Sequence, residues 1–199
     1  MKAIVMHQYG GPEVLQYEEA PMPEINPEDI LIKVSAAGIN PVDWKIRQGI
    51  AKDHFPQQFP VILGWDVAGT VVETGALVTR FKKGDHVFSR PDIFRKGCYA
   101  EYVAVRSDEA AFAPENVSPE EAAGVPLVAL TAWMMIFEKA NLQARQKILI
   151  HAASGGVGSF AVQLAKMVGA YVIGTTSEAN IDFVKSLGAD EVINYKTED

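Results

Sequence analysis

The stretch from residue 148 to residue 163 constrains the fold more than any other part of the sequence. It reads ILIHAASGGVGSFAVQ, an apolar run followed by a glycine-rich turn. Beyond the turn, Phe160, Leu164 and Val168 recur at helical spacing, so the period of the apolar residues changes from two to about 3.6. The pattern predicts a buried strand, a tight turn and a helix.

The turn between this strand and this helix is suited to bind a diphosphate. The first N–H groups of a helix have no intrahelical acceptor, and the helix dipole places about half a positive charge beside them. Gly155, Gly156 and Gly158 let the backbone approach the phosphates and let the helix lie on the strand. With Ser154 and Val157, these glycines form the predicted cofactor-binding loop.

The same alternation of strand and helix continues after the loop. Residues 171–175 and 191–195 read as strands, and residues 181–187 read as the helix between them. This βαβαβ pattern is typical of one half of a dinucleotide-binding domain. It is more specific than a glycine-rich turn in an arbitrary α/β protein.

Composition narrows the class of protein. The net charge is −7 with no block of Lys or Arg, so a nucleic-acid partner lacks its usual electrostatic footprint. Cys98 is the only cysteine, which excludes an intrachain disulfide and a multi-cysteine zinc site. No apolar run is long enough to span a bilayer, and no signal sequence is recognisable. We therefore expect no membrane association and a cytoplasmic location.

The first half of the chain has a different pattern, with short strands separated by Pro and Gly. A short turn of helix fits only at residues 42–47, and Ser118 and Glu121 then form a capping box that opens a helix. A longer helix follows at residues 127–140. We expect a mostly β, barrel-like domain at residues 1–124 and a partial dinucleotide-binding domain at residues 125–199. The predicted strands are Ala3–Met6, Leu15–Glu18, Ile30–Ala37, Asp66–Thr74, His86–Phe88 and Ala100–Val105.

Several motifs together resemble one known family. They are AGINPVD at 37–43, GWDVAG at 64–69, KGDHV at 83–87, YAEY at 99–102, LTAW at 130–133 and AASGGVG at 152–158. In this order and spacing they resemble the medium-chain dehydrogenase/reductase superfamily, and within it the zinc-independent quinone oxidoreductases. The resemblance implies an α/β protein with a GroES-like catalytic domain and a doubly wound Rossmann domain. Family members continue well beyond Asp199, so it also implies a carboxyl-terminally truncated chain, and a homodimer in the full-length form.

The zinc ligands of metal-dependent relatives correspond here to Asn40, Trp65 and Leu127. None of these side chains supplies a thiolate or an imidazole, so we expect no metal. Without a metal to polarise an alcohol, alcohol oxidation is disfavoured. Reduction of an electron-poor acceptor, a quinone or an activated alkene (an enone or enal), agrees better with these residues.

The end of the second predicted strand bears on the choice of cofactor. NAD-binding relatives place an acidic residue there, whereas this chain has Thr175, Thr176 and Ser177, whose hydroxyls can receive a phosphate. We therefore predict NADPH rather than NADH, and the resemblance places Tyr195 beside the adenosine phosphate. Alternatively, Ser177 and Glu178 are only a helix cap and a first-turn acid.

At the reacting end, the resemblance suggests Asn40, Lys45 and Thr131. Asn40 would bind the substrate carbonyl, and Thr131 would lie near the nicotinamide. Lys45 would stabilise the oxyanion formed on hydride addition and donate a proton, unless it only lies on the solvated face of a short helix. Asp43 is expected to orient a loop. Four aromatic residues either line an apolar cleft or pack in the core; they are Trp44, Phe55, Phe59 and Trp65.

These features favour an NADPH-dependent oxidoreductase that transfers hydride to a quinone or enone. One alternative is an enoyl-thioester reductase, which needs a basic cluster for a large acidic tail. The other is a catalytically silent NADPH-binding or interaction module, since the chain is shorter than its relatives.

Overall fold

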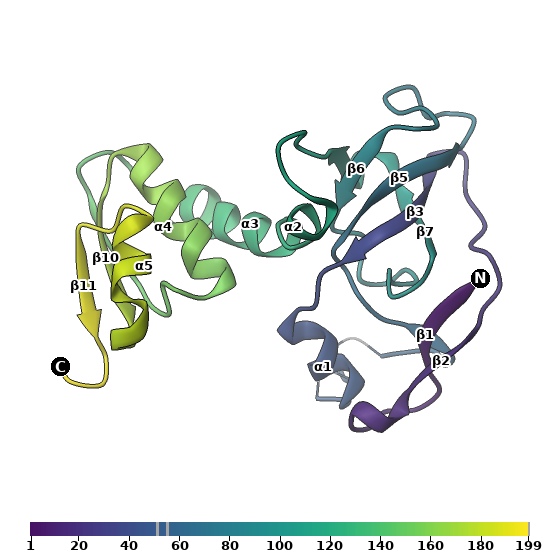
Figure 1. Ribbon diagram of the computed structural model, residues 1–199, viewed down its shortest axis with the longest axis horizontal. Coiled ribbons are helices and arrows are strands. Elements are labelled where there is room, and N and C mark those ends of the chain that lie inside the picture. The colour runs from purple at the N-terminus through teal and green to yellow at the C-terminus, as the bar shows by residue number, and fades with distance from the viewer. Residues whose placement is uncertain (51, 55, 199) are drawn as a thin grey trace. The chain divides into compact units, whose positions relative to one another are not determined.

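The chain forms two compact units, Met1–Leu127 and Val128–Asp199, in a computed structural model that describes residues 1–50, 52–54 and 56–198 (Figure 1). Phe55 lies outside the described residues. The division falls within the helix α3 (Pro126–Trp133). Within the part that the structure describes, no helix is both long enough and apolar enough to cross a membrane.

Unit 1, Met1–Leu127, is built on two antiparallel sheets. The larger has the order β7-β3-β5-β6-β8, and the smaller has the order β2-β1-β4. Register shifts between β3 and β5 follow Leu31 and Val34, and such bulges increase the twist of a sheet. The strands are β1 (Lys2–Met6), β2 (Leu15–Glu19), β3 (Asp29–Ala37), β4 (Val61–Ile62), β5 (Val67–Thr74), β6 (His86–Ser89), β7 (Tyr102–Arg106) and β8 (Ala110–Phe112).

All six strands predicted for this unit are confirmed within a few residues, whereas β4 and β8 were missed. Both are too short to show a period in the sequence. The core of the larger sheet is aliphatic, and Ile30, Ile32, Val71 and Val105 are fully buried. The buried residues of β3 and β7 are consecutive, Asp29–Ile32 and Val103–Val105, so both faces of these strands are covered at these positions.

The helices of unit 1 are short. They are α1 (Pro41–Arg47), α2 (Pro119–Ala123) and the 3₁₀ turns η1 (Pro12–Val14) and η2 (Ser107–Glu109). The predicted capping box is present, since Glu121 N donates to Ser118 Oγ at 3.2 Å and Ser118 N donates to Glu121 Oε2 at 2.8 Å. Ala122 and Ala123 then bury α2 against Ala68 of the sheet.

Unit 2, Val128–Asp199, contains a parallel sheet of order β11-β10-β9. The strands are β9 (Lys147–Ile150), β10 (Tyr171–Thr176) and β11 (Glu191–Asn194), and the helices are α4 (Gly156–Val168), α5 (Ile181–Ser186) and the 3₁₀ turn η4 (Glu178–Asn180). Val162 and Ala165 of α4 share a buried cluster with Val172 and Val184. The predicted βαβαβ pattern is therefore confirmed.

One predicted helix differs in its detail. The segment expected at residues 127–140 begins as α3 and continues as a π-helix, η3 (Met134–Lys139). Ile136 faces the core, whereas Met134 and Met135 remain exposed. Apolar residues fill most of this stretch, including residues 132–137, and they conceal the change of helical period from the sequence.

Candidate functional site

The glycine loop joins the carboxyl end of β9 to the start of α4. Gly155 is the residue before the helix, with φ −79° and ψ 172°, and it brings no side-chain acceptor to the first turn. At Gly158, a Cβ would overlap the carbonyl oxygen of Ala152 and would lie 2.7 Å from Ala153 Cα. Only glycine permits this close approach of α4 to the loop backbone.

The loop is open on its other side, as a diphosphate requires. A Cβ at Gly155 would meet nothing nearer than the Ala152 oxygen, at 3.3 Å. Gly155, Gly156 and Val157 are exposed, and a hollow of about 390 Å³ adjoins the loop. These residues fit the diphosphate of a dinucleotide, because free N–H groups and the helix dipole attract an anion to a helix start.

Bonds to the end of β10 hold the loop in place. Ala152 N donates to Thr175 Oγ1 at 3.3 Å, Ala153 N donates to Thr175 O at 2.9 Å, and the hydroxyls of Ser154 and Thr176 lie 2.8 Å apart. Ala152 has φ 51°, a left-handed conformation that is unfavourable for a residue with a Cβ. The two threonines thus have a role in positioning the loop, which the sequence pattern did not reveal.

This role limits what the threonines offer a cofactor. Thr175 is 9% exposed and Thr176 only 1% exposed. Ser177 is more accessible, and its hydroxyl does not cap η4; it accepts from Asn180 Nδ2 at 3.4 Å. Of the three hydroxyls, that of Ser177 is therefore the best placed for a cofactor phosphate. Cofactor binding by these residues stays a prediction.

Tyr195 lies at the same edge of the parallel sheet. It follows β11, is 59% exposed, and its N–H donates to Thr176 O at 3.3 Å. The glycine loop, Ser177 and Tyr195 thus come directly after the carboxyl ends of β9, β10 and β11. Ligands of open α/β sheets bind at this edge. Thr131 lies in α3 and is partly buried.

In unit 1, Asn40 is bound to a buried carboxylate that the sequence interpretation did not single out. Asn40 immediately precedes α1 and is 6% exposed, and its Nδ2 donates to Asp66 Oδ2 at 2.8 Å. Leu127 N donates to the other oxygen, Oδ1, also at 2.8 Å. Burial is the main cause that raises the pKa of Asp66, to about 6.

A second carboxylate, Asp43, holds the start of α1. Its Oδ2 accepts from Asn40 N and from Tyr99 Oη, each at 2.6 Å, which agrees with the predicted orienting role. Burial raises the pKa of Asp43, although both hydrogen bonds act in the opposite direction. Cys98 is fully buried and donates to Asp66 O at 3.1 Å, and burial raises the pKa of its thiol to about 12.

Lys45 lies on the exposed side of α1, with its Nζ 5.6 Å from the centre of the Trp44 ring. Both interpretations of Lys45 therefore remain open. Trp65 is fully buried in a cluster with Met6 and Ile46, so it is a core residue rather than part of a cleft. Trp44 is 41% and Phe59 37% exposed.

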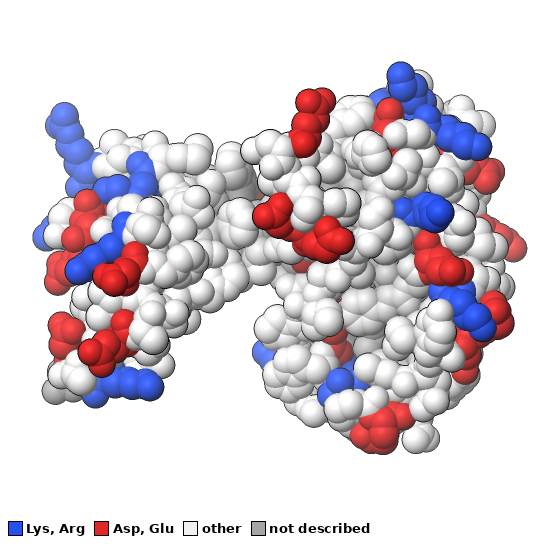
Figure 2. Space-filling view, viewed as in Figure 1, with Lys and Arg blue, Asp and Glu red and all other residues white. Residues whose placement is uncertain are grey.

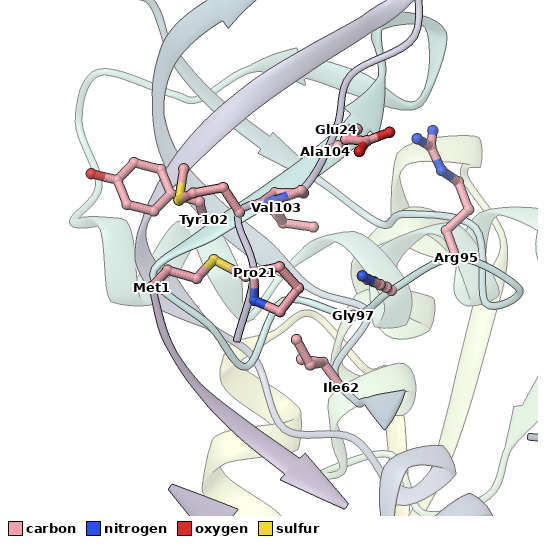
Figure 3. Close-up of a pocket in the computed structure, with 12 residues that line it drawn as sticks. Met1, Pro21, Glu24, Ile62, Arg95, Gly97, Tyr102, Val103 and Ala104 are labelled. Carbon is pink, nitrogen blue, oxygen red and sulfur yellow. The ribbon is translucent and has the colours of Figure 1, made fainter. Parts of the chain in front are cut away.

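Two further observations concern charges and hollows. No group of three or more His, Cys, Asp and Glu side chains gathers within the described residues in a way that suits a metal. On the face shown in Figure 2, basic and acidic side chains alternate rather than forming one basic patch. Unit 1 also contains a hollow of about 460 Å³. Figure 3 shows Met1, Pro21, Ile62 and Arg95, which line it. None of the predicted site residues lines it.

Comparison with known proteins identifies the family. Residues 26–115 match a family model described as the alcohol dehydrogenase GroES-like domain, and residues 156–199 match one described as zinc-binding dehydrogenase. A chloroplastic quinone-oxidoreductase homolog from Spinacia oleracea is 43% identical over 99% of this chain and 63% of its own length. The chain belongs to the quinone oxidoreductases of the medium-chain dehydrogenase/reductase superfamily.

Two further proteins are similar to this chain over its whole length. A 2-methylene-furan-3-one reductase from Solanum lycopersicum is 40% identical over the whole of this chain and 53% of its own length. The structure of Escherichia coli quinone oxidoreductase complexed with NADPH superposes with a TM-score of 0.88 and 35% identity, over 100% of this chain and 60% of that one. The chain thus spans between 53% and 63% of the length of these three relatives. The predicted mixed α/β fold is confirmed.

Proposed function

We propose that the chain is the substrate-binding and diphosphate-binding part of an NADPH-dependent reductase of quinones or activated alkenes. The observation that carries the proposal is the open glycine loop, held at the carboxyl edge of a parallel sheet that ends in hydroxyls instead of an acidic residue. The relatives named quinone oxidoreductase and 2-methylene-furan-3-one reductase support the two acceptor classes.

When bound, NADPH would supply the hydride, and the protein would position and polarise the acceptor. The glycine loop binds the diphosphate, and Ser177 and Tyr195 bind the adenosine phosphate. Asn40 donates an N–H to the acceptor carbonyl, and Thr131 lies near the nicotinamide. The ammonium of Lys45 stabilises the enolate or hydroquinone oxyanion and provides a proton. Asn40, Trp65 and Leu127 provide no metal ligand, so no metal takes part in this proposal.

Cofactor preference is tested by titrating the 199-residue chain with NADPH and with NADH. We expect tighter binding of NADPH, and a loss of that preference in Ser177→Ala and Tyr195→Phe. Tyr171→Phe is the matched control, because Tyr171 is 39% exposed and begins β10 at the opposite edge of the sheet. Preference for NADH, or NADPH affinity unchanged in both variants, would contradict the proposed cofactor.

Activity is tested by oxidation of NADPH with a quinone, small enones and an enoyl thioester. Turnover with quinones or enones supports the reductase, whereas binding of NADPH without turnover favours the silent NADPH-binding module. Loss of turnover in Lys45→Ala, but not in the control Lys52→Ala, supports the proton-donor role. Equal turnover in both variants assigns Lys45 to the solvated face of α1.

Three further properties are part of the same proposal. We propose a cytosolic protein with no nucleic-acid or membrane partner, and a homodimer in the full-length form. Cell fractionation and mass measurement in solution test location and assembly, respectively.

A further inference from the structure

Asp66 links segments of unit 1 that are remote in the sequence. It is 1% exposed, and its two carboxylate oxygens separately accept Asn40 Nδ2 and Leu127 N, each at 2.8 Å. Its backbone oxygen accepts Gly38 N at 2.9 Å and Cys98 Sγ at 3.1 Å. The residue next to it, Trp65, and its partners Asn40 and Leu127 occupy the three positions that hold zinc in metal-dependent relatives. One carboxylate thus connects the segments that a metal connects elsewhere.

The protonation state of the Asp66 carboxyl group decides how the side-chain amide of Asn40 is oriented. An ionised carboxylate is only an acceptor, so it binds Asn40 through the NH₂ group, as observed. A protonated carboxyl also carries a donor. Its O–H on Oδ2 would donate to Asn40 Oδ1, which requires the amide to turn over. In the observed orientation Oδ1 faces Asp43 N in the capping box of α1, so the rotation also changes the group that Asn40 presents to the start of this helix.

We propose that Asp66 is a positioning residue for Asn40: ionised Asp66 holds the amide with one Nδ2 hydrogen left for the substrate carbonyl, and protonation of Asp66 turns the amide over. The statement about the substrate rests on the proposed function, whereas the rotation of the Asn40 amide can be tested in this chain without substrate. With Asp66 ionised, the amide keeps its Nδ2 on the carboxylate. With Asp66 protonated, Oδ1 takes that place and Nδ2 is released from the carboxylate.

The surroundings of Asp66 place this change in an accessible pH range. Burial raises its pKa to about 6, and the hydrogen bonds from Asn40 and Leu127 lower it in part. The charge of Asp43 on α1 raises it further, and that of Arg90 lowers it. Cys98 and Tyr99 also face this group, but burial raises the pKa of each well above this range. Asp43 is thus the only other group in this set that can ionise near Asp66.

Nuclear magnetic resonance of the ¹⁵N-labelled 199-residue chain, without cofactor or substrate, tests the rotation. The side-chain amide signals of Asn40 are assigned by their loss in Asn40→Ala and followed from pH 5 to pH 8. We expect both protons to shift with a midpoint near pH 6. Asp66→Asn, which cannot ionise, should abolish the titration.

Asn26 provides an internal control in the same molecule. Its Nδ2 donates to Asp29 Oδ2 at 2.9 Å, which is the same kind of Asn–Asp pair. Asp29, however, is bound by two nitrogens of Arg95, at 2.6 and 2.9 Å, and its pKa lies below the ordinary value. The Asn26 signals should therefore stay constant from pH 5 to pH 8.

The outcomes separate this inference from the proposed function. Constant Asn40 signals in the wild-type chain would overturn the inference, even if NADPH binds and is oxidised. A titration that persists in folded Asp66→Asn would overturn it too, because another group would then be responsible. If the Asn40 signals change with pH, the Asn26 signals stay constant and the chain fails to bind NADPH, the result supports the positioning role of Asp66 and contradicts the proposed function.

Discussion

Gly158→Ala and Gly155→Ala should separate the stability of the glycine loop from its affinity for a dinucleotide. At position 158, the new Cβ would overlap Ala152 O and lie 2.7 and 2.9 Å from Ala153 Cα and C. Carbon atoms normally approach to about 3.5 Å at the closest favourable distance, so the loop backbone must move. At position 155, the backbone angles suit alanine and the Cβ enters the open side of the loop.

The cost of Gly158→Ala follows from these contacts. Overpacking costs about 1 to 3 kcal/mol, and each hydrogen bond lost between the loop and Thr175 costs about 1 kcal/mol more. The higher helix propensity of alanine offsets about 1 kcal/mol. We therefore expect unit 2 to lose about 3 kcal/mol of stability in Gly158→Ala, against less than about 1 kcal/mol in Gly155→Ala.

Hydrogen exchange measured by mass spectrometry reports unit 2 separately from unit 1. Peptides that cover β9 and α4 give the free energy of opening, and calorimetric titration gives the dissociation constant for NADPH. We expect Gly155→Ala to retain protection but to bind NADPH at least about tenfold more weakly, or about 1.4 kcal/mol. Wild-type protection in Gly158→Ala, or wild-type affinity in Gly155→Ala, would refute this account of the loop.

Three further predictions follow from burial and hydrogen bonding. Cys98 should not react with a thiol reagent at pH 8 in the native chain, but should react in urea; equal rates in both would contradict its burial. The wild-type chain should lose stability relative to Asp66→Asn as pH rises from about 4 through about 6, because the pKa of Asp66 is higher in the folded chain than in the unfolded chain. Urea unfolding at each pH should show a loss of about 3 kcal/mol. A gain in stability over this range would contradict the raised pKa of Asp66. Thr176→Val removes the hydrogen bond between the hydroxyls of Thr176 and Ser154, and it should weaken NADPH binding about tenfold, or by about 1.4 kcal/mol. Thr197→Val, at an exposed position, is the control and should leave the affinity unchanged.

The sequence predicts the parts of this fold whose patterns are local. The period change across the glycine loop and the Ser118–Glu121 capping box each lie within a few residues, and both are confirmed. The short strands β4 and β8 depend on partners far away in the chain, so no local pattern marks them. The π-helical turns of η3 are hidden because apolar residues fill most of the segment.

The candidate site was less predictable because its contacts join distant residues. Asp66 meets Asn40 across 26 positions and Leu127 across 61. A carboxylate after Trp65 gives no sign in the sequence that it is buried or that it orients an amide. The threonines of β10 illustrate the same limit. Their hydroxyls suggested a phosphate site, but the bonds to the loop appear only when β9 and β10 pair.

The bonds between the loop and β10 also limit how cofactor preference can be redesigned. An acidic residue in place of Thr176, the usual way to favour NADH, would place a charge beside Ser154 and displace the hydroxyl that steadies the loop. Selectivity and affinity would then change together. Ser177 has no bond to the loop among the described contacts, so an engineer, or natural selection, could alter it to exchange one nicotinamide cofactor for the other while leaving diphosphate binding intact.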